Sequence, residues 1–457
     1  PHFGINFSKA KLITDDKIVT GPAWFSIMEI PLPVGLPFAY FPFTESKKSG
    51  FLMPSYGYAK NRGYYLRNIG WYFAINDYMD LALQGDIYTN LSYALNITSS
   101  YVKRYKYSGS IEFRYEDNHT GLRNTPSYSS SNAFKFRWSH RQDSKAHPNR
   151  SFSANVNLVS SKFNQYTTNL SDYFNNTTTS SIAFSSKLGS YWNMTANLGE
   201  SYNVNTGAIS LELPSVSLST TQIYPLRKKK KQGKNKWYED ISLSYRVNMI
   251  NKIDTYDTLL TSPDIFKSFR NGIIHSLPIQ SNVKIFKHLN WTNSIDYTER
   301  WYSNSISKTY NPETDLIDKD TIYGFIANRN VNFKSSLNTR LYGMFIFKKG
   351  FIKAIRHVIN PNISFTYTPD FSHPSLGFYD FYTDKEGNRI YYSRTENGIY
   401  GSPAQGASGI LNFSIGNNLE MKLKNANDTI TGERKIRLLE SFNISSGYDL
   451  AKDRLNR

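Results

Sequence analysis

Hydrophobic and polar residues alternate along most of this chain. Between residues 107 and 117 one face of an extended strand carries Tyr107, Gly109, Ile111, Phe113 and Tyr115, and the other carries Ser108, Ser110, Glu112, Arg114 and Glu116. The same period of two occurs at 151–159 and 241–249, and again near 79–89, 132–140, 181–187, 363–369 and 410–416. It is typical of β-strands with one apolar and one polar face. We therefore predict an all-β protein with about 17 antiparallel strands after residue 50.

The connections between these strands differ in length in a regular way. Short turns are predicted near 75–78, 103–107, 142–149, 188–191, 226–237, 287–290 and 347–356, and long polar connections near 116–132, 160–179, 253–271, 304–323 and 370–404. The two kinds tend to alternate, as in outer-membrane barrels with short periplasmic turns and longer extracellular loops. The pattern predicts a large antiparallel transmembrane β-barrel over 47–457. Because its odd strand count ends in mid-pattern, we expect a truncated barrel, with further strands after Arg457 in a longer protein.

The first 46 residues differ from the rest of the chain, because they are denser in apolar residues and proline. They are predicted to be the end of a separate β-domain followed by a proline-rich connector. Since proline fixes its backbone φ angle, the prolines of this stretch are predicted to form a stiff hinge between two rigid bodies. They are Pro31, Pro33, Pro37 and Pro42.

One predicted strand contains a proline at its centre. In "KKSGFLMPSYGYAK" (47–60), alternation places Phe51, Met53, Ser55 and Gly57 on one face, and Leu52, Pro54, Tyr56 and Tyr58 on the other. Proline has no N–H for the hydrogen-bond ladder, so it belongs at a sheet edge or at a bulge.

Composition narrows the choice of partner. The 457 residues carry a net charge of +18, which favours an anionic partner such as nucleic acid, phospholipid headgroups or lipopolysaccharide. The run "RKKKKQGKNK" (227–236) resembles a nucleic-acid patch. At a short barrel turn, however, a solvated charge run explains it better, and no nucleic-acid partner is predicted. The sequence has no uncharged apolar stretch of about 18 residues, so no transmembrane helix is predicted.

Patterns typical of catalysis and metal binding are missing from the sequence. The absence of cysteine excludes disulfides and thiolate metal sites within this chain. The eight histidines are scattered without HExxH or HxxxH spacing, and the nucleophile motif GxSxG does not occur. We therefore predict no catalytic residue, no metal and no cofactor.

Several longer stretches share a more specific pattern. They are "AWFSIMEIPLPVGLPFAYFPF" (23–43), "KKSGFLMPSYGYAKNRGYYL" (47–66), "WYFAINDYMDLALQGDIYT" (71–89) and "AIRHVINPNISFTYTPDF" (354–371). These stretches resemble LptD, the family of outer-membrane lipopolysaccharide-assembly proteins, in what looks like its Bacteroidetes branch. The resemblance implies a periplasmic β-jelly-roll followed by a barrel, in the outer membrane of a Gram-negative cell.

The resemblance also implies a transporter component, not an enzyme, and a mechanism of transport. In this family the first and last barrel strands pair weakly, and lipopolysaccharide leaves sideways into the outer leaflet. The lateral gate would lie at Phe51, Leu52, Met53, Pro54 and Gly70. Pro54 would remove one donor from the ladder. Gly70 stands where the family's second strand tends to carry a proline, so this chain departs from the family pattern at that position.

A lipid-binding groove is implied in the N-terminal segment, where it would guide acyl chains toward the barrel. Its residues would be Trp24, Phe25, Ile27, Met28 and Ile30, for which core packing between sheets is an equal alternative. The implied partners are lipopolysaccharide, an LptE-like plug lipoprotein and a periplasmic LptA-like jelly-roll bridge. Arg114 and Arg246 on the lumen face could steer lipid phosphates, or could balance Glu112 and Glu116.

Two other functions stay open. A diffusion porin or TonB-dependent transporter would share the barrel pattern, although it has no need of a proline-rich β-domain in front. A soluble β-sandwich adhesin would share the alternation alone.

Overall fold

The structure is a computed structural model, and it describes most of the chain. The described residues are 3–13, 17–27, 30–42, 48–60, 62–121, 124–160, 176–228, 233, 236–286, 288–424 and 433–451. The chain divides into two compact units, residues 1–146 with 154–178 and residues 147–153 with 179–457. Among the described residues, no helix is long and apolar enough to cross a membrane.

The first unit begins with two small antiparallel sheets. One has the order β1 (Phe3–Phe7), β4 (Ala23–Ile27) and β5 (Ile30–Leu36), and the other has the order β2 (Ala10–Ile13), β3 (Lys17–Thr20) and β6 (Ala39–Pro42). Ala23, Ser26 and Ala39 are buried between their neighbours, and the buried Thr20 hydroxyl accepts a hydrogen bond of 3.0 Å from the Ala39 N–H. The N-terminal segment thus has the β-structure that was predicted.

The proline-rich connector was predicted wrongly. Pro31 and Pro33 lie within β5, Pro42 is the last residue of β6, and Pro37 lies in the short turn between the two strands. Both strands stand at the edge of their three-stranded sheet. A missing N–H costs little at an edge, because one side of the strand has no ladder to complete. Pro31, Pro33 and Pro42 are therefore strand residues and Pro37 is a turn residue, and their role as a hinge stays a prediction.

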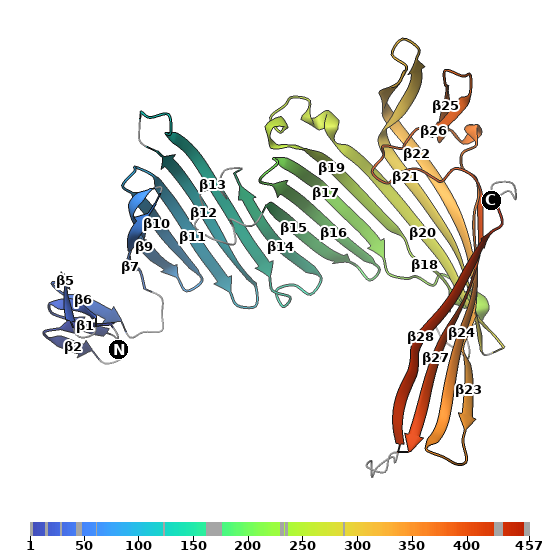
Figure 1. Ribbon diagram of the computed structural model, residues 1–457, viewed down its shortest axis with the longest axis horizontal. Helices are drawn as coiled ribbons and strands as arrows, with labels where there is room; N and C mark the ends of the chain where they lie inside the picture. The colour runs from blue at the N-terminus through green and yellow to red at the C-terminus, as the bar shows by residue number, and fades with distance from the viewer. Residues whose placement is uncertain are drawn as a thin grey trace. The chain divides into compact units, whose positions relative to one another are not determined.

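The first unit continues with a larger antiparallel sheet, in which β7 and β8 both pair with β9 and the next strands pair in chain order (Figure 1). They are β7 (Gly50–Leu52), β8 (Ser55–Ala59), β9 (Gly63–Asn76), β10 (Met79–Tyr88), β11 (Tyr93–Lys103), β12 (Tyr107–Thr120) and β13 (Ser129–Gln142), and β14 (Arg150–Val159) follows them in the chain. The turns at 77–78 and 104–106 agree with the predicted short connections.

The second unit is also built of antiparallel strands. They are β15 (Thr177–Leu188), β16 (Trp192–Asn203), β17 (Ala208–Thr220), β18 (Ile241–Leu243), β19 (Arg246–Tyr256), β20 (Arg270–Ile285), β21 (Leu289–Asn311), β22 (Leu316–Thr339), β23 (Leu341–Ile346), β24 (Ile352–Thr368), β27 (Ser408–Lys424) and β28 (Glu433–Asp449). Its connections contain the 3₁₀ turns η1 (Trp237–Asp240), η2 (Asp257–Leu259), η3 (Ile265–Ser268) and η4 (Pro374–Leu376).

The fold is all-β, with a large antiparallel sheet of about 20 strands that is consistent with a β-barrel. Of the 22 described strands from β7 to β28, β25 and β26 form a separate hairpin. At three places two successive strands pair with the same partner and so occupy one position in the sheet. They are β7 and β8 against β9, β18 and β19 against β20, and β22 and β23 against β24. This leaves the 17 strand positions that the alternation predicted.

The sheet of the first unit exposes its apolar face and buries its polar face. On β10 to β13 the exposed side chains include Ile87 (55%), Leu95 (43%) and Phe134 (44%). Asp86, Glu116, Asn118 and Lys135 on the opposite face are at most 5% exposed. A strand with its apolar face toward lipid and its polar face toward a lumen has this distribution. The ladder also places Ile111 and Phe113 on the face opposite Glu112 and Arg114, as predicted.

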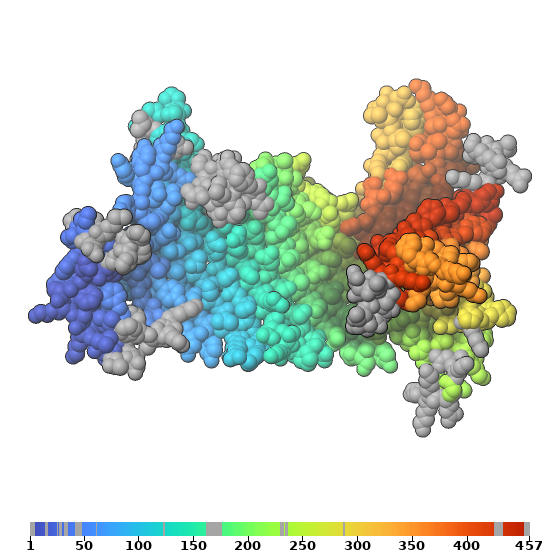
Figure 2. Space-filling view, turned by 60° about the horizontal axis from the view of Figure 1, so that its bottom comes forward, coloured from blue at the N-terminus to red at the C-terminus, as the bar shows by residue number. Residues whose placement is uncertain are grey.

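One predicted loop is an extension of two strands. Residues 304–323 were predicted to be a long polar connection, but they stay paired from Asn304 with Tyr323 to Asn311 with Leu316. β21 and β22 reach 23 and 24 residues, about twice the 9–11 that a membrane requires. The alternation of apolar and polar residues did not predict this extension, because a hairpin in water needs no apolar face toward lipid. Figure 2 shows its gold tip beside the orange strands β25 (Tyr379–Thr383) and β26 (Arg389–Ser393).

The connection between β24 and β27 folds back onto the polar face of its own unit. The Tyr302 hydroxyl donates to the Gly401 carbonyl at 2.7 Å, and the Tyr400 hydroxyl donates to the Asn248 carbonyl on β19 at 3.2 Å. Burial raises the pKa of Tyr400 to about 12, so its hydroxyl stays neutral and remains a donor at physiological pH. The buried Asn328 side chain holds Thr395 of the same connection at 2.7 Å.

The two faces predict opposite responses to charge at neighbouring positions of β11. Ile97 is paired with Phe113 on the apolar face, and Thr98 is paired with Glu112 on the polar face. We expect Ile97→Arg to destabilise the protein in lipid by about 2–4 kcal/mol. Thr98→Arg should cost less than about 1 kcal/mol, because it adds a cation beside an acidic side chain. Urea unfolding in lipid vesicles measures both, and equal losses would show that the face assignment is wrong.

Candidate functional site

The predicted strand at 51–59 is broken at its proline. β7 and β8 both pair with β9, and Leu52 opposite Gly70 is followed by Ser55 opposite Arg67. The sum of the paired residue numbers stays constant across the gap, so the two segments keep one register. Met53 and Pro54 therefore form an unpaired interval inside one strand, which we call the first-strand break.

The partner strand, β9, is irregular at the residues opposite this break. The register places Asn68 opposite Pro54, and Asn68 has the left-handed φ of 60°. Asparagine adopts this conformation more readily than most residues. Between β9 and β10 the pairing shifts by one residue here, because Gly85 faces Ile69 whereas Ile87 faces Leu66. This shift is a β-bulge, and it explains the position of the proline.

At the break, the outward-facing side chains change from odd-numbered to even-numbered residues. Phe51 (53%) and Met53 (62%) are exposed before the break, and Tyr56 (86%) and Tyr58 (63%) are exposed after it. The prediction that Phe51, Met53, Ser55 and Gly57 share one face is therefore wrong. A bulge adds one residue to a strand and so reverses which alternate side chains face outward.

On the polar face, charged and aromatic side chains hold the bulge in place. The Asn68 N–H, which has no strand partner at the bulge, donates to the Asp86 carboxylate at 2.9 Å. Asp86 also accepts 2.8 Å from Arg114, whose Nε donates 2.6 Å to Glu116. The Arg67 Nε donates to the Tyr88 hydroxyl at 2.9 Å. Arg114, predicted either to steer phosphates or to balance charge, thus balances Asp86 and Glu116.

Two glycines beside the break lie in close contact with a neighbouring residue. Gly70 is paired with Leu52 on one side and Gln84 on the other, and a Cβ on it would overlap the Leu83 carbonyl oxygen of β10. Gly57 faces Tyr65, whose hydroxyl oxygen would lie 2.5 Å from an added Cβ and would have to move. Gly70 is therefore a fully paired residue at a close approach of two backbones, and it does not interrupt β9.

The predicted lipid-groove residues lie on β4 and β5, apart from Met28, which lies outside the described residues. Trp24 is half-buried, and Ile30 is 68% exposed. The side chains of Phe25 and Ile27 lie outside the described part of the chain. The basic run 227–236 belongs to the connection between β17 and β18, where Arg227 pairs with Asp240 at 3.2 Å, and most of its lysines are likewise not described.

A comparison with protein families decides the assignment, since the model of the LptD protein family matches residues 18–457. The chain belongs to the LptD family. No curated protein matches it. The family transports and assembles lipopolysaccharide at the outer membrane and is not an enzyme family, so the match favours neither a porin nor a soluble adhesin. As in this family, the exposed apolar face of the antiparallel sheet suits a barrel in the outer membrane.

Sequence reasoning found Pro54 but missed the partners that make its position possible in this LptD-family chain. Asn68 carries no pattern of its own, because a left-handed residue inside a strand cannot be seen from alternation. Asp86 sits in a strand whose polar face contains many such residues. The one available signal was the change from outward odd positions (Phe51, Met53) to outward even positions (Tyr56, Tyr58), which marks a bulge.

The close approach at Gly70 gives a prediction with a matched control in the next strand. Gly70→Ala must push the Leu83 carbonyl away, and we expect a loss of about 1–3 kcal/mol. Gly85→Ala, whose nearest contact would be 3.7 Å, should be neutral or slightly stabilising. Unfolding in detergent by heat-modifiable gel migration compares them. A tolerated Gly70→Ala would show that β9 and β10 can separate locally without cost.

Proposed function

We propose that this chain is the outer-membrane translocon component that inserts lipopolysaccharide into the outer leaflet. The lipid would leave through a lateral gate between the first barrel strand, formed by β7 and β8, and the last strand of the barrel. The observation that carries the proposal is the first-strand break, because it loosens the hold of β9 on the strand that forms one side of the gate.

The energetic argument starts from the backbone. A strand pair inside a membrane opens only if its hydrogen bonds break, because lipid offers no replacement partners. Each backbone hydrogen bond contributes about 0.5–1.5 kcal/mol net. Met53 and Pro54 make no pair with β9 in the described ladder, and Pro54 brings no donor at all. A first strand with this gap is held to β9 by fewer bonds, so it can be displaced more easily when its seam with the last strand opens.

The bulge between β9 and β10 also supports the proposal. Because Asp86 binds the Asn68 N–H, β9 keeps its shape without help from Pro54. The first strand can then move while β9 stays fixed to the Asp86, Arg114 and Glu116 network. The gate residues would be Phe51, Leu52, Met53 and Pro54. Gly70 would act as the fixed point where β9 lies closest to β10, in place of a second proline.

The remaining parts of the pathway follow from the family. Lipopolysaccharide would arrive from a periplasmic LptA-like bridge and pass the N-terminal sheets, where Trp24, Phe25, Ile27, Met28 and Ile30 would contact its acyl chains. An LptE-like lipoprotein would fill the lumen. The many exposed aromatic side chains beside the break, such as Tyr56 and Tyr58, would provide an apolar wall for the departing chains.

Pro54→Ala tests the gate. The substitution returns one backbone donor to the strand, which is worth about 0.5–1.5 kcal/mol. Since about 1.4 kcal/mol is tenfold in an equilibrium, opening should become several-fold rarer. We expect normal barrel assembly with reduced surface lipopolysaccharide and greater sensitivity to large hydrophobic antibiotics.

Pro361→Ala is the matched control, because Pro361 also lies inside a strand and is paired with Ile415 on β27. It adds the same donor to β24 opposite the interval between β22 and β23, so it tests an interrupted ladder away from the first strand. Export should be unchanged in this variant. Equal export defects in the two variants, or normal export in Pro54→Ala, would contradict the lateral gate at the first-strand break.

A further inference from the structure

The polar face of the first unit carries an arginine directly beside the first-strand break. Arg67 lies on β9, and the register pairs it with Ser55 of β8. Its guanidinium carbon lies 4.0 Å from the centre of the Tyr65 ring and 5.4 Å from that of the Tyr88 ring. Its Nε also donates to the Tyr88 hydroxyl at 2.9 Å. Two aromatic rings and one hydrogen bond therefore hold this cation in place.

The positive charge of Arg67 is not neutralised by a carboxylate. In the part of the chain that the structure describes, Arg67 forms no ion pair. Asp86, on the same face, is instead bound by Arg114 and by the Asn68 N–H. A second guanidinium, that of Arg62, lies 5.1 Å from the centre of the same tyrosine ring of β10. Because a guanidinium has five N–H donors and only the Nε of Arg67 is used, the others are available to an anion.

Small residues of the first strand leave Arg67 accessible from the gate. Ser55, opposite Arg67, is small, and Gly57 has no side chain. The Tyr65 ring lies across the strand there, with its hydroxyl oxygen 2.5 Å from the place of a Gly57 Cβ. Among the described residues, that hydroxyl has no hydrogen-bond partner. A fixed cation and a free hydroxyl thus lie side by side on the polar face of the gate.

Exposed tyrosines on the opposite face give the height of Arg67 in the membrane. Tyr58 and Tyr64 face outward, and their ring centres are 5.2 Å apart. Such aromatic side chains form the girdle at the membrane–water boundary of a barrel. Arg67 follows Tyr64 on β9 and lies about 8 Å from it along the membrane normal, at a strand tilt of about 40°. This end of β9 is opposite the predicted periplasmic turn at 77–78, so Arg67 lies near the headgroups of the outer leaflet.

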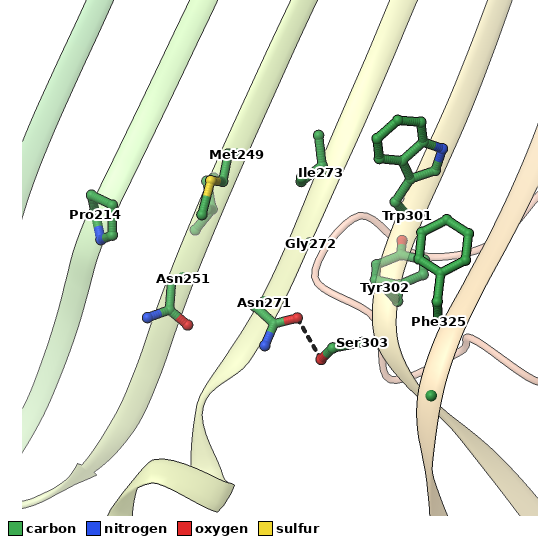
Figure 3. A pocket seen from close by; sticks show the side chains of 12 residues that line it. Pro214, Met249, Asn251, Asn271, Gly272, Ile273, Trp301, Tyr302, Ser303 and Phe325 are labelled. Carbon is green, nitrogen blue, oxygen red and sulfur yellow. Dashed lines mark hydrogen bonds between the residues drawn. The ribbon is translucent and has the colours of Figure 1, made fainter.

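The outer wall of the second unit offers another place for lipid, a hollow of about 510 Å³ over β17 and β19 to β22 (Figure 3). Its apolar lining includes Pro214, Met249, Ile273, Trp301 and Phe325. The hollow opens on the outward face, where Arg329 is paired with Glu299. That carboxylate accepts a hydrogen bond of 2.8 Å from the Trp301 Nε1. The arginine beside the hollow therefore has a carboxylate opposite it, whereas Arg67 has none.

We propose that Arg67 and the Tyr65 hydroxyl bind the phosphorylated sugar headgroup of lipopolysaccharide on the polar side of the gate. A guanidinium pairs with phosphate through charge-assisted hydrogen bonds, and the tyrosine hydroxyl can bind a sugar hydroxyl. A phospholipid brings the phosphate without the sugar ring. The first-strand break lies on the membrane-centre side of Arg67, where the acyl chains would pass. This inference rests on the proposed function, which brings lipopolysaccharide to this face of the sheet.

Crosslinking from position 55 tests the site in the purified full chain, because the sequence contains no cysteine of its own. Ser55→Cys is labelled with a benzophenone maleimide in phosphatidylcholine nanodiscs, and the capture of lipid A is measured against its concentration. We expect Arg67→Gln to raise the concentration for half-maximal capture about tenfold. Arg67→Lys keeps the charge without the planar fork and should raise it less. Capture of dephosphorylated lipid A should be the same in all three proteins, which also shows that the variants are folded.

Arg329→Gln is the matched control, because it removes an arginine from the outward face beside the hollow. It should leave the half-maximal concentration unchanged. Equal shifts in Arg329→Gln and Arg67→Gln would place lipid A on the outer wall and overturn the site. Capture that depends neither on Arg67 nor on phosphate would overturn this site alone, whereas no capture from position 55 would also contradict the proposed route. Competition by phosphatidylglycerol as strong as that by unlabelled lipid A would overturn the choice of a phosphorylated sugar.

Discussion

The constraint on which this structure depends is that a strand in a membrane must satisfy its backbone through neighbouring strands. Lipid offers no replacement for a lost hydrogen bond, so each irregular position needs a partner from the protein itself. At the first-strand break, Pro54 has no N–H to satisfy, and the Asn68 N–H opposite it is bound by Asp86. The break therefore leaves this donor paired, while the pairing between the first two strands becomes shorter.

The same constraint shapes both faces of the sheet. Apolar side chains are turned outward, and the polar side chains opposite them form ion pairs such as Arg114 with Asp86 and Lys334 with Asp296. A bulge reverses this alternation, so it must be matched in the neighbouring strand to keep one face apolar. β7, β8 and β9 reverse together at Pro54 and Asn68. Without the matching bulge, the alternation would continue past Pro54, and Tyr56 and Tyr58 would lie on the polar face.

Irregular backbone also marks the two features of the wall that a regular sheet could not provide. In the first unit, the break and the bulge weaken one strand and fix the next. In the second unit, the shifts after Glu212 and Tyr302 open a hollow between otherwise adjacent strands. Trp301 stays at its edge because Glu299 and His275 hold its ring. Irregular pairing thus marks both the interrupted first strand and the hollow.

The sequence by itself determined the all-β fold, the 17 strand positions and the unusual place of Pro54, because a period of two and a missing N–H are local properties. Prediction from the sequence was wrong where the structural environment of a residue matters more than the local alternation. Pro31 and Pro33 were predicted to lie in a connector, yet edge strands tolerate them, and 304–323 looked like a loop because strands in water keep no apolar face. Only the tertiary structure decided that Asn68 lies opposite Pro54, that Gly70 meets Leu83, and that Asp86 binds the bulge. Those are pairings between distant residues, and their register depends on bulges that alternation alone does not reveal.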